Sequence, residues 1–221
     1  MTKTKVEKHF DKVAESYDFY KKKNSFYYDN LKKLLRSLIP PKSDVFEFGC
    51  GTGELLTSLN PKNGHGFDIS KEMIKLAKFK HKSNKNLHFS DSFSEIVNHQ
   101  SYVFMSDVIE HLENPAETFK QISKLMDKNT KYIITMANPI WEPFLMLAEK
   151  LRLKMPEGPH KRIKYRDLRS EIEKRGLRII KHDYTLLIPV KIPLITKFAN
   201  KYFEKPFRKL CFIEYFVIKK S

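Results

Sequence analysis

Three glycines at alternate positions follow a short apolar segment that contains a carboxylate. The segment reads Asp44-Val-Phe-Glu-Phe-Gly-Cys-Gly-Thr-Gly-Glu54, so the glycines are Gly49, Gly51 and Gly53. Glycine adopts positive φ angles without steric cost and lets a ligand approach the backbone closely. A strand, a glycine turn and a helix start in this order predict a site for a nucleotide-like ligand, with N–H donors at the helix start.

The spacing of the motif differs from that of dinucleotide sites. A dinucleotide fingerprint reads G-x-G-x-x-G, whereas here the third glycine comes one residue early and Glu54 takes the sixth position. Glu47 also precedes Gly49 by two residues. A carboxylate suits a ligand with positive charge and would repel a pyrophosphate. A glycine-rich structural turn is the alternative for this motif taken alone.

The string E-x-G-x-G-x-G, read from Glu47, resembles the first motif of the class I S-adenosylmethionine (SAM) dependent methyltransferases. Two further strings resemble the branch of that family that includes the ubiquinone/menaquinone biosynthesis enzymes. They are Phe10-Asp-Lys-Val-Ala-Glu-Ser-Tyr17-Asp18, and D-x-x-E-H-L-x-x-P from Asp107 to Pro115. The resemblance covers roughly residues 7–184 and is more specific for cofactor and fold than for the methyl acceptor.

The resemblance implies S-adenosyl-L-methionine as cofactor and S-adenosyl-L-homocysteine as product. Asp68 lies 19 residues after Gly49, where an acid can hold both ribose hydroxyls. Asp91 is expected to accept from the adenine amino group, and Tyr17 to close over the methionine part, where its ring face favours a cation. The expected cofactor-binding residues are Tyr17, Glu47, Gly49, Cys50, Gly51, Gly53, Asp68, Ile69, Met73, Asp91, Ser92, Phe93, Ser106 and Asp107.

Structural roles remain open for several of these side chains. Asp68 would also serve as an N-cap of the following helix, although Ser70 is placed for the same task. Asp91 would also fit a solvated turn, and Tyr17 would fit the apolar face of an amphipathic helix.

Methyl transfer by in-line displacement requires an acceptor atom held close to the methyl carbon and on its axis. A hydroxyl acceptor, which we expect, is helped by a base that takes its proton. His111 is the first candidate base and His160 the second, because histidine titrates near neutral pH. The expected substrate-binding residues are Tyr20, Asn138, Trp141 and Arg162. For Trp141, a role as a core residue is the alternative.

Strands and helices alternate along most of the chain. Strands are predicted at 44–48, 65–68, 87–90, 102–105, 131–136, 177–187 and 211–219, and helices at 3–18, 26–38, 53–59, 70–81, 114–126 and 165–175. This order predicts a three-layer α/β fold with a doubly wound, mostly parallel sheet. The seven strands and the antiparallel edge strand follow the Rossmann-like fold of the resembled family.

Residues 1–221 are expected to form one domain. It comprises a helical lid at 1–40, a core at 41–184, and a basic amphipathic insertion with the last strand at 185–221. Two cysteines argue against a disulfide framework, the histidines match no metal-ligand pattern, and no metal is predicted. The first residues lack an apolar signal core, which together with the cysteine content predicts a cytoplasmic location.

Positive charge is concentrated in the last third of the chain. Residues 1–149 carry 22 Lys and Arg against 19 Asp and Glu, whereas residues 150–221 carry 20 against 7. Lysines and apolar residues around 194–205 predict a basic amphipathic helix, which either lies on an anionic membrane surface or packs with solvated lysines. We therefore predict methylation of a small-molecule, lipid-like or phosphorylated acceptor. An RNA methyltransferase or RNA-binding module is the alternative, disfavoured because the motif of nucleic-acid amino-methyltransferases is missing after the fourth strand. The sequence does not indicate the oligomeric state.

Overall fold

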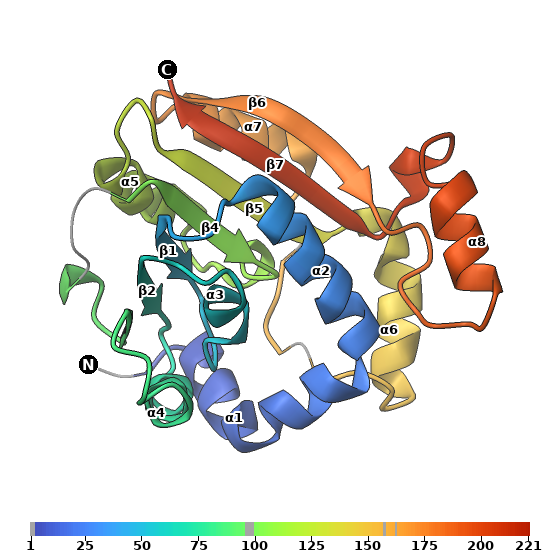
Figure 1. Ribbon diagram of the computed structural model, residues 1–221, viewed down its shortest axis with the longest axis horizontal. Helices are drawn as coiled ribbons and strands as arrows, with labels where there is room; N and C mark the ends of the chain where they lie inside the picture. The colour runs from blue at the N-terminus through green and yellow to red at the C-terminus, as the bar shows by residue number, and fades with distance from the viewer. Residues whose placement is uncertain (1–2, 96–99, 157, 162) are drawn as a thin grey trace.

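A seven-stranded sheet forms the centre of the part of the protein that the computed structural model describes, which is residues 3–95, 100–156, 158–161 and 163–221 (Figure 1). The strand order is β3-β2-β1-β4-β5-β7-β6. The strands are β1 (Asp44–Phe48), β2 (Asn63–Phe67), β3 (Leu87–Ser90), β4 (Tyr102–Ser106), β5 (Lys131–Ala137), β6 (Leu177–Thr185) and β7 (Ile213–Lys220). The predicted mostly parallel, doubly wound sheet is confirmed.

The antiparallel strand is β7, which lies one place in from the edge that β6 forms. It pairs antiparallel with both β5 and β6, whereas the other pairs are parallel. Consequently β6 points in the same direction as β5. The carboxyl ends of β1 to β6 and the amino end of β7 share one edge of the sheet, here called the carboxyl edge, where ligands bind in folds of this kind.

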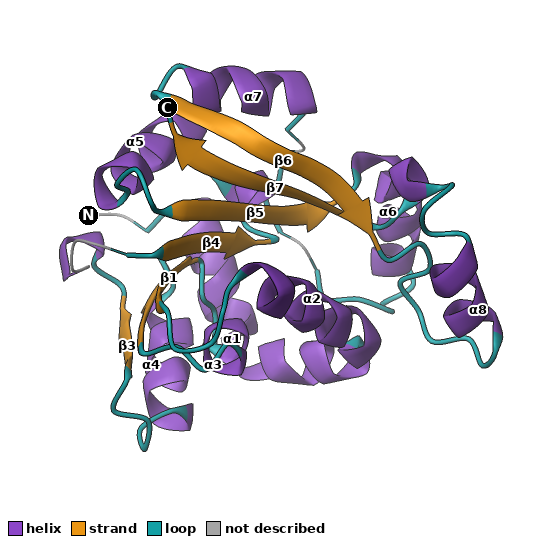
Figure 2. Cartoon of the chain, turned by 45° about the horizontal axis from the view of Figure 1, so that its top comes forward, coloured by secondary structure: helices purple, strands orange, loops and turns teal. Residues whose placement is uncertain are grey.

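Helices cover both faces of the sheet (Figures 1 and 2). The helices are α1 (Lys5–Lys23), α2 (Ser25–Leu38), α3 (Glu54–Ser58), α4 (Lys71–Lys80), α5 (Pro115–Leu125), α6 (Glu142–Lys150), α7 (Tyr165–Glu173) and α8 (Ile195–Tyr202). Leu31 and Leu35 of α2 pack on one face with α3 and α4. Phe119 and Ile122 of α5 pack on the other with α7. Because both faces are covered, the central strands are nearly continuous apolar runs.

Side-chain caps fix the starts of three helices. The side chains of Thr4, Ser70 and Asn114 accept a backbone N–H at the starts of α1, α4 and α5, as N-caps do. The predicted first helix ended near Asp18, but α1 continues to Lys23. The lysines in its last turn suit the negative end of the helix dipole, so the charge run belongs to the helix.

Two helices lie at one end of the molecule, beyond the carboxyl edge (Figures 1 and 2). One is α6, which follows β5 and contains no buried residue. The other is α8, which belongs to the connection between β6 and β7. The helix α6 is absent from the sequence-based expectation. Among the described residues, none of the helices combines the length and the apolar character that crossing a bilayer requires.

Candidate functional site

The predicted glycine turn lies between β1 and α3, at the carboxyl edge. Gly49, Gly51 and Gly53 have φ angles of +75°, +52° and +79°, which residues with a Cβ rarely adopt. The N–H groups of Gly49 and Cys50 donate to the carbonyl oxygen of Phe67, at 2.7 and 2.9 Å. The turn is therefore fastened to the end of β2.

Two of the glycines also leave room for neighbouring side chains. A Cβ built on Gly49 would lie 2.4 Å from Cγ2 of Val108, and one built on Gly51 would lie 3.0 Å from Cε1 of Tyr17. Because Tyr17 belongs to α1, this helix approaches the turn closely and places the Tyr17 ring against Gly51.

Asp68 follows β2 and directs its side chain at the turn. Its carboxylate oxygens accept from the N–H groups of Gly51 at 2.8 Å and Ser70 at 2.9 Å. The residue is buried, and burial raises the pKa of its carboxyl group. Ser70 caps α4, because its Oγ accepts from the N–H of Met73. Helix capping therefore does not account for Asp68.

Glu47 lies buried beneath the turn. Its Oε2 accepts from the N–H of Leu56 in α3 at 3.1 Å. Burial raises the pKa of Glu47 to about 8, against the opposing charge of Lys21. At pH 7 the carboxyl group is therefore largely protonated, and a cation placed beside it would favour the ionised form.

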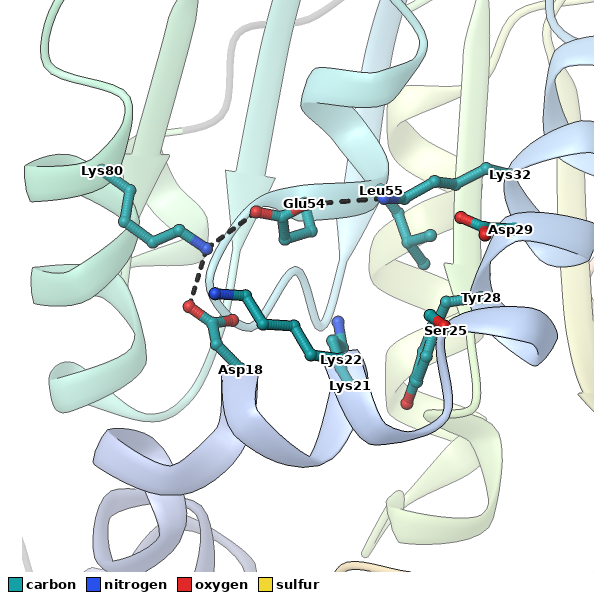
Figure 3. Close-up of a pocket in the computed structure, with 10 residues that line it drawn as sticks. All are labelled: Asp18, Lys21, Lys22, Ser25, Tyr28, Asp29, Lys32, Glu54, Leu55 and Lys80. Atoms are coloured by element: carbon teal, nitrogen blue, oxygen red, sulfur yellow. Dashed lines mark hydrogen bonds and ion pairs between the residues drawn. The ribbon is translucent and has the colours of Figure 1, made fainter.

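Two tyrosine rings flank the ammonium group of Lys21. Its Nζ lies 4.5 Å from the centre of the Tyr17 ring and 5.0 Å from that of Tyr28 (Figure 3 shows Lys21 and Tyr28). Its charge opposes the effect of burial on the pKa of Glu47 and of Asp68. Since ring faces and carboxylates attract cations, this place suits a positively charged group. The Lys21 ammonium stands in for such a group in this structure.

A network of ion pairs fastens α1 to the helices around the turn (Figure 3). Asp18 accepts from Thr52 Oγ1 and from Lys80 Nζ, each at 2.7 Å. Lys80 also contacts Glu54 at 2.9 Å, and Glu54 contacts Lys32 at 3.5 Å. A pocket of about 240 Å³ opens beside this network, between α1, α2 and α3. The network holds α1 over the carboxyl edge.

Five more of the expected cofactor-binding residues occupy different environments. Ile69 and Asp91 are exposed, and Ser92 is half-buried. Met73 is buried in the core, and the Phe93 ring packs against phenylalanine rings of β1 and β2. Ile69 is therefore open to solvent, the Asp91 carboxylate lies 4.0 Å from the Lys71 ammonium, and Met73 and Phe93 have packing contacts.

Polar side chains line the ends of β4 and β5. Asp107 has a φ of +55°, and its Oδ2 accepts from the Tyr27 hydroxyl of α2 at 2.7 Å. Ser106 and Thr135 face each other in the register of β4 and β5. Both hydroxyls are buried and have no hydrogen-bond partner within the described residues. Buried polar groups normally have a partner, so these two enclosed hydroxyls are exceptions within the sheet.

The two candidate bases lie near each other, with ring centres 6.3 Å apart. His111 Nδ1 lies 3.0 Å from the Pro159 carbonyl oxygen. Because a carbonyl only accepts, Nδ1 carries the proton, and Nε2 is the basic nitrogen of the neutral ring. His160 Nδ1 lies 3.0 Å from the Gly158 carbonyl and its Nε2 3.3 Å from Glu142 Oε1. His160 therefore has a described partner at both nitrogens.

The expected substrate-binding residues differ in their surroundings. The Asn138 amide donates to the carbonyls of Lys209 and Cys211, each at 2.9 Å, so this side chain joins two segments of backbone. Trp141 Nε1 donates to the Leu210 carbonyl at 2.9 Å, and its ring contacts Phe144 and Phe212.

The other two expected substrate-binding residues are Tyr20 and Arg162. Tyr20 lies one helical turn after Tyr17 on α1, with its ring against Phe19. Arg162 lies outside the described residues.

Three residues of the site were not identified from the sequence. They are Lys21, Tyr27 and Tyr28, which α1 and α2 bring to the carboxyl edge. Lys21 and Tyr28 follow Tyr17 at four and eleven residues, which is close to whole turns of a continuous helix. The spacing from Tyr17 could have identified Lys21 as a residue of the site. It could not identify Tyr28, because the helix is interrupted at Asn24 between α1 and α2.

A family model described as "Methyltransferase domain" matches residues 19–182. An O-methyltransferase for malonyl-[acyl-carrier protein] from Marinomonas is 30% identical over 133 residues, covering 56% of this chain and 48% of that protein. An uncharacterised protein of Methanocaldococcus jannaschii is 31% identical over 130 residues, covering 57% and 59%. The matched region thus spans about half the length of these curated relatives.

Solved structures share the fold over nearly the whole chain. The protein in complex with the Trm112 methyltransferase activator of Haloferax volcanii has a TM-score of 0.69 at 15% identity, covering 96% of this chain and 97% of its own. A SAM-dependent methyltransferase of Thermotoga maritima has a TM-score of 0.68 at 15% identity, covering 98% and 99%. Magnesium protoporphyrin IX methyltransferase of Synechocystis, solved with S-adenosylhomocysteine, has a TM-score of 0.59 at 17% identity, covering 90% and 83%. The Rossmann-like fold predicted from the sequence is confirmed.

Proposed function

Because this chain belongs to the methyltransferase domain family, we propose that it transfers the methyl group of S-adenosyl-L-methionine to an oxygen atom of a small amphiphilic or phosphorylated acceptor. The observation that carries this proposal is the position of the Lys21 ammonium between the Tyr17 and Tyr28 rings. It identifies a place for a cation beside two buried carboxyl groups and next to the glycine turn.

The residues at this place fit the cofactor. S-adenosylmethionine supplies a methyl group on a sulfonium cation, which makes that methyl strongly electrophilic. Tyr17, Tyr28 and Glu47 would hold the cationic end. Asp68 keeps the glycine turn in shape through the Gly51 N–H and retains lone pairs on its carboxylate for ribose hydroxyls.

The chain's own residues would also prepare the acceptor. His111 takes the proton of a hydroxyl at Nε2 while its Nδ1–H remains on the Pro159 carbonyl. The helix α1 covers this edge through Tyr17 and Asp18 and keeps water away from it.

Oxygen as the methylated atom has two supports. His111 is a base of the kind that a hydroxyl acceptor requires. The Marinomonas relative is an O-methyltransferase by name, although it matches only part of this chain.

Titration calorimetry with S-adenosylmethionine and S-adenosylhomocysteine tests the cofactor. We expect saturable binding of both, and no heat from either would contradict the proposal. Incubation with methyl-labelled cofactor and fractionated lysate tests the acceptor. Label in the lipid or small-molecule fraction is expected, whereas label in RNA would support the alternative of an RNA methyltransferase.

A further inference from the structure

The helix α8 is attached to the protein by its polar residues. Thr196 is buried, donates to the Val190 carbonyl at 2.7 Å and accepts from the Ile192 N–H at 2.9 Å. Asn200, one turn later, accepts from the Ile188 N–H at 2.8 Å. Glu204, a further turn on, accepts from the Leu186 N–H and the Thr185 hydroxyl. One polar stripe thus faces the segment that precedes α8, and through Glu204 it reaches the end of β6.

The apolar side chains of the same segment face outward. Leu194 is 89% exposed and Phe198 is 58% exposed. The other exposed large apolar residues between 188 and 210 are Val190, Ile192, Ile195, Tyr202, Phe203, Phe207 and Leu210. A helix on a protein surface normally turns its apolar stripe to the core. Here the arrangement is inverted, so the segment does not pack as an ordinary amphipathic helix.

The helix α6 adds a second exposed apolar surface at the same end of the molecule (Figures 1 and 2). Its exposed apolar residues, with those just after it, are Phe144, Met146, Leu147, Leu151 and Leu153. Trp141 and Asn138, which precede α6, are hydrogen-bonded to the backbone of residues 209–211. We call α6 with residues 151–153 and the segment 188–210 together the apolar end. Exposed apolar side chains gathered at one end of a protein in this number mark an interaction site.

The charge of the apolar end identifies the partner. Segment 188–210 contains five lysines and one arginine against a single acid, Glu204. All six cations are exposed, whereas Glu204 is bound to the body of the protein. Exposed aromatic and aliphatic side chains can insert among the acyl chains of a bilayer, and lysines between them are attracted to anionic headgroups. The apolar end is therefore complementary to a bilayer with anionic headgroups.

We infer that the apolar end docks the protein on an anionic membrane surface. The helix α6 follows the carboxyl end of β5, and the α8 segment follows the carboxyl end of β6. The apolar end therefore adjoins the carboxyl edge that carries the site. Resting on the proposed function, the further step is that the acceptor is an amphiphile drawn from the bilayer. Docking itself is independent of catalysis.

Vesicle sedimentation tests the docking. The full chain is mixed with phosphatidylcholine vesicles that contain or lack about a third of phosphatidylglycerol, at low and high salt. We expect binding to the anionic vesicles that weakens with salt. Phe198→Glu and Phe144→Glu should each lower the partition coefficient at least tenfold. Phe79→Glu is the matched control, because Phe79 on α4 is 70% exposed and lies outside the apolar end.

Lysine variants test the electrostatic part without touching apolar contacts. Each lysine near an anionic surface contributes about fivefold to binding. Lys197→Ala with Lys201→Ala should therefore weaken binding about 25-fold, whereas Lys124→Ala with Lys128→Ala, which remove two exposed lysines at and after the end of α5, should leave it unchanged. Circular dichroism confirms that each variant is folded.

Three outcomes would overturn the inference. They are failure of the wild-type chain to bind anionic vesicles at low salt, equal loss in the Phe79→Glu control, and dissociation of a dimer by Phe198→Glu without vesicle binding. The last outcome would assign the apolar end to a protein interface. Cofactor calorimetry on the same variants separates docking from the proposed function, because docking variants should bind S-adenosylmethionine like the wild type.

Discussion

The Lys21 ammonium lies 4.5 Å from the centre of the Tyr17 ring, in the same helix and one turn further on. The Tyr17 ring also lies against Gly51 in the glycine turn. A cation of the protein therefore occupies the surroundings that suit the cation of the proposed cofactor. Lys21 and the cofactor would compete for the same tyrosine faces.

Lys21→Ala should therefore strengthen the binding of S-adenosylmethionine. A cation–π contact is worth about 1 kcal/mol, which corresponds to roughly fivefold in affinity, and S-adenosylhomocysteine should gain less because its sulfur is neutral. Calorimetric dissociation constants for both ligands measure this. Lys22→Ala, one residue on and exposed, is the control and should leave the ratio of the two constants unchanged. Weaker binding in Lys21→Ala would show that Lys21 assists the cofactor.

Glu47→Gln should flatten the pH dependence of stability. The pKa of Glu47 is raised from 4.5 to about 8 in the folded protein, so the folded state binds its proton more tightly than the unfolded state. Its contribution is complete below about pH 4.5 and is lost as pH rises to about 8, a difference on the order of 4 kcal/mol.

Urea denaturation at several pH values measures this effect. The wild type and Glu47→Gln should be similar near pH 4.5, because glutamine resembles the protonated acid, and the variant should be more stable near pH 8. Glu15→Gln, at an exposed position of α1, should follow the wild type. Parallel curves for the wild type and Glu47→Gln would show that Glu47 does not retain its proton.

The regular strands and helices of the core could be predicted because the spacing of apolar residues in the sequence follows which side chains are buried. The strand at 87–90 is confirmed with the same bounds, and α5 begins at Pro115, one residue after the predicted start at Asn114. The helix α6 was missed because it has no buried stripe, so its sequence lacks the signal on which such predictions rest.

The site could be predicted only where one local motif contains it. The glycine turn and Asp68 lie within twenty residues of each other and come together as expected. Tyr27 and Asp107 are 80 residues apart, and only the packing of α2 on the sheet joins them at 2.7 Å. Asn138 was predicted to bind substrate, and its amide donates to the backbone near 210, a contact that no local pattern indicates.

Gly51→Ala, compared with Gly176→Ala, should separate the effect of backbone strain on stability from the effect of the Tyr17 contact on cofactor binding. Its φ of +52° imposes a cost of about 1–2 kcal/mol on a residue with a Cβ, and the new Cβ would press on Tyr17. Gly176→Ala is a matched control, because Gly176 has a φ of +66° and a Cβ there would meet nothing within 4 Å. Both variants should lose stability in thermal melts through the positive φ, with a further loss for Gly51→Ala from the contact with Tyr17, and calorimetry should show weaker cofactor binding for Gly51→Ala alone.

His111→Asn should remove the proposed base and keep the local structure. An asparagine amide can still donate to a carbonyl, so the bond to Pro159 has a replacement. Loss of a general base lowers kcat by about 100-fold or more, while cofactor affinity should stay close to that of the wild type. Methyl transfer from labelled cofactor to the acceptor fraction measures the rate, and calorimetry measures the cofactor affinity.

His160→Asn is the comparison for this prediction, because both nitrogens of His160 are already held by Gly158 and Glu142. Its kcat should fall much less than that of His111→Asn. An equal fall in both variants would assign the two histidines to a shared structural role. A single general base takes the proton, so loss of the base should affect only one of the two variants strongly. A larger fall in His160→Asn would move the base to His160, and the hydrogen bond to Glu142 would then orient the catalytic ring.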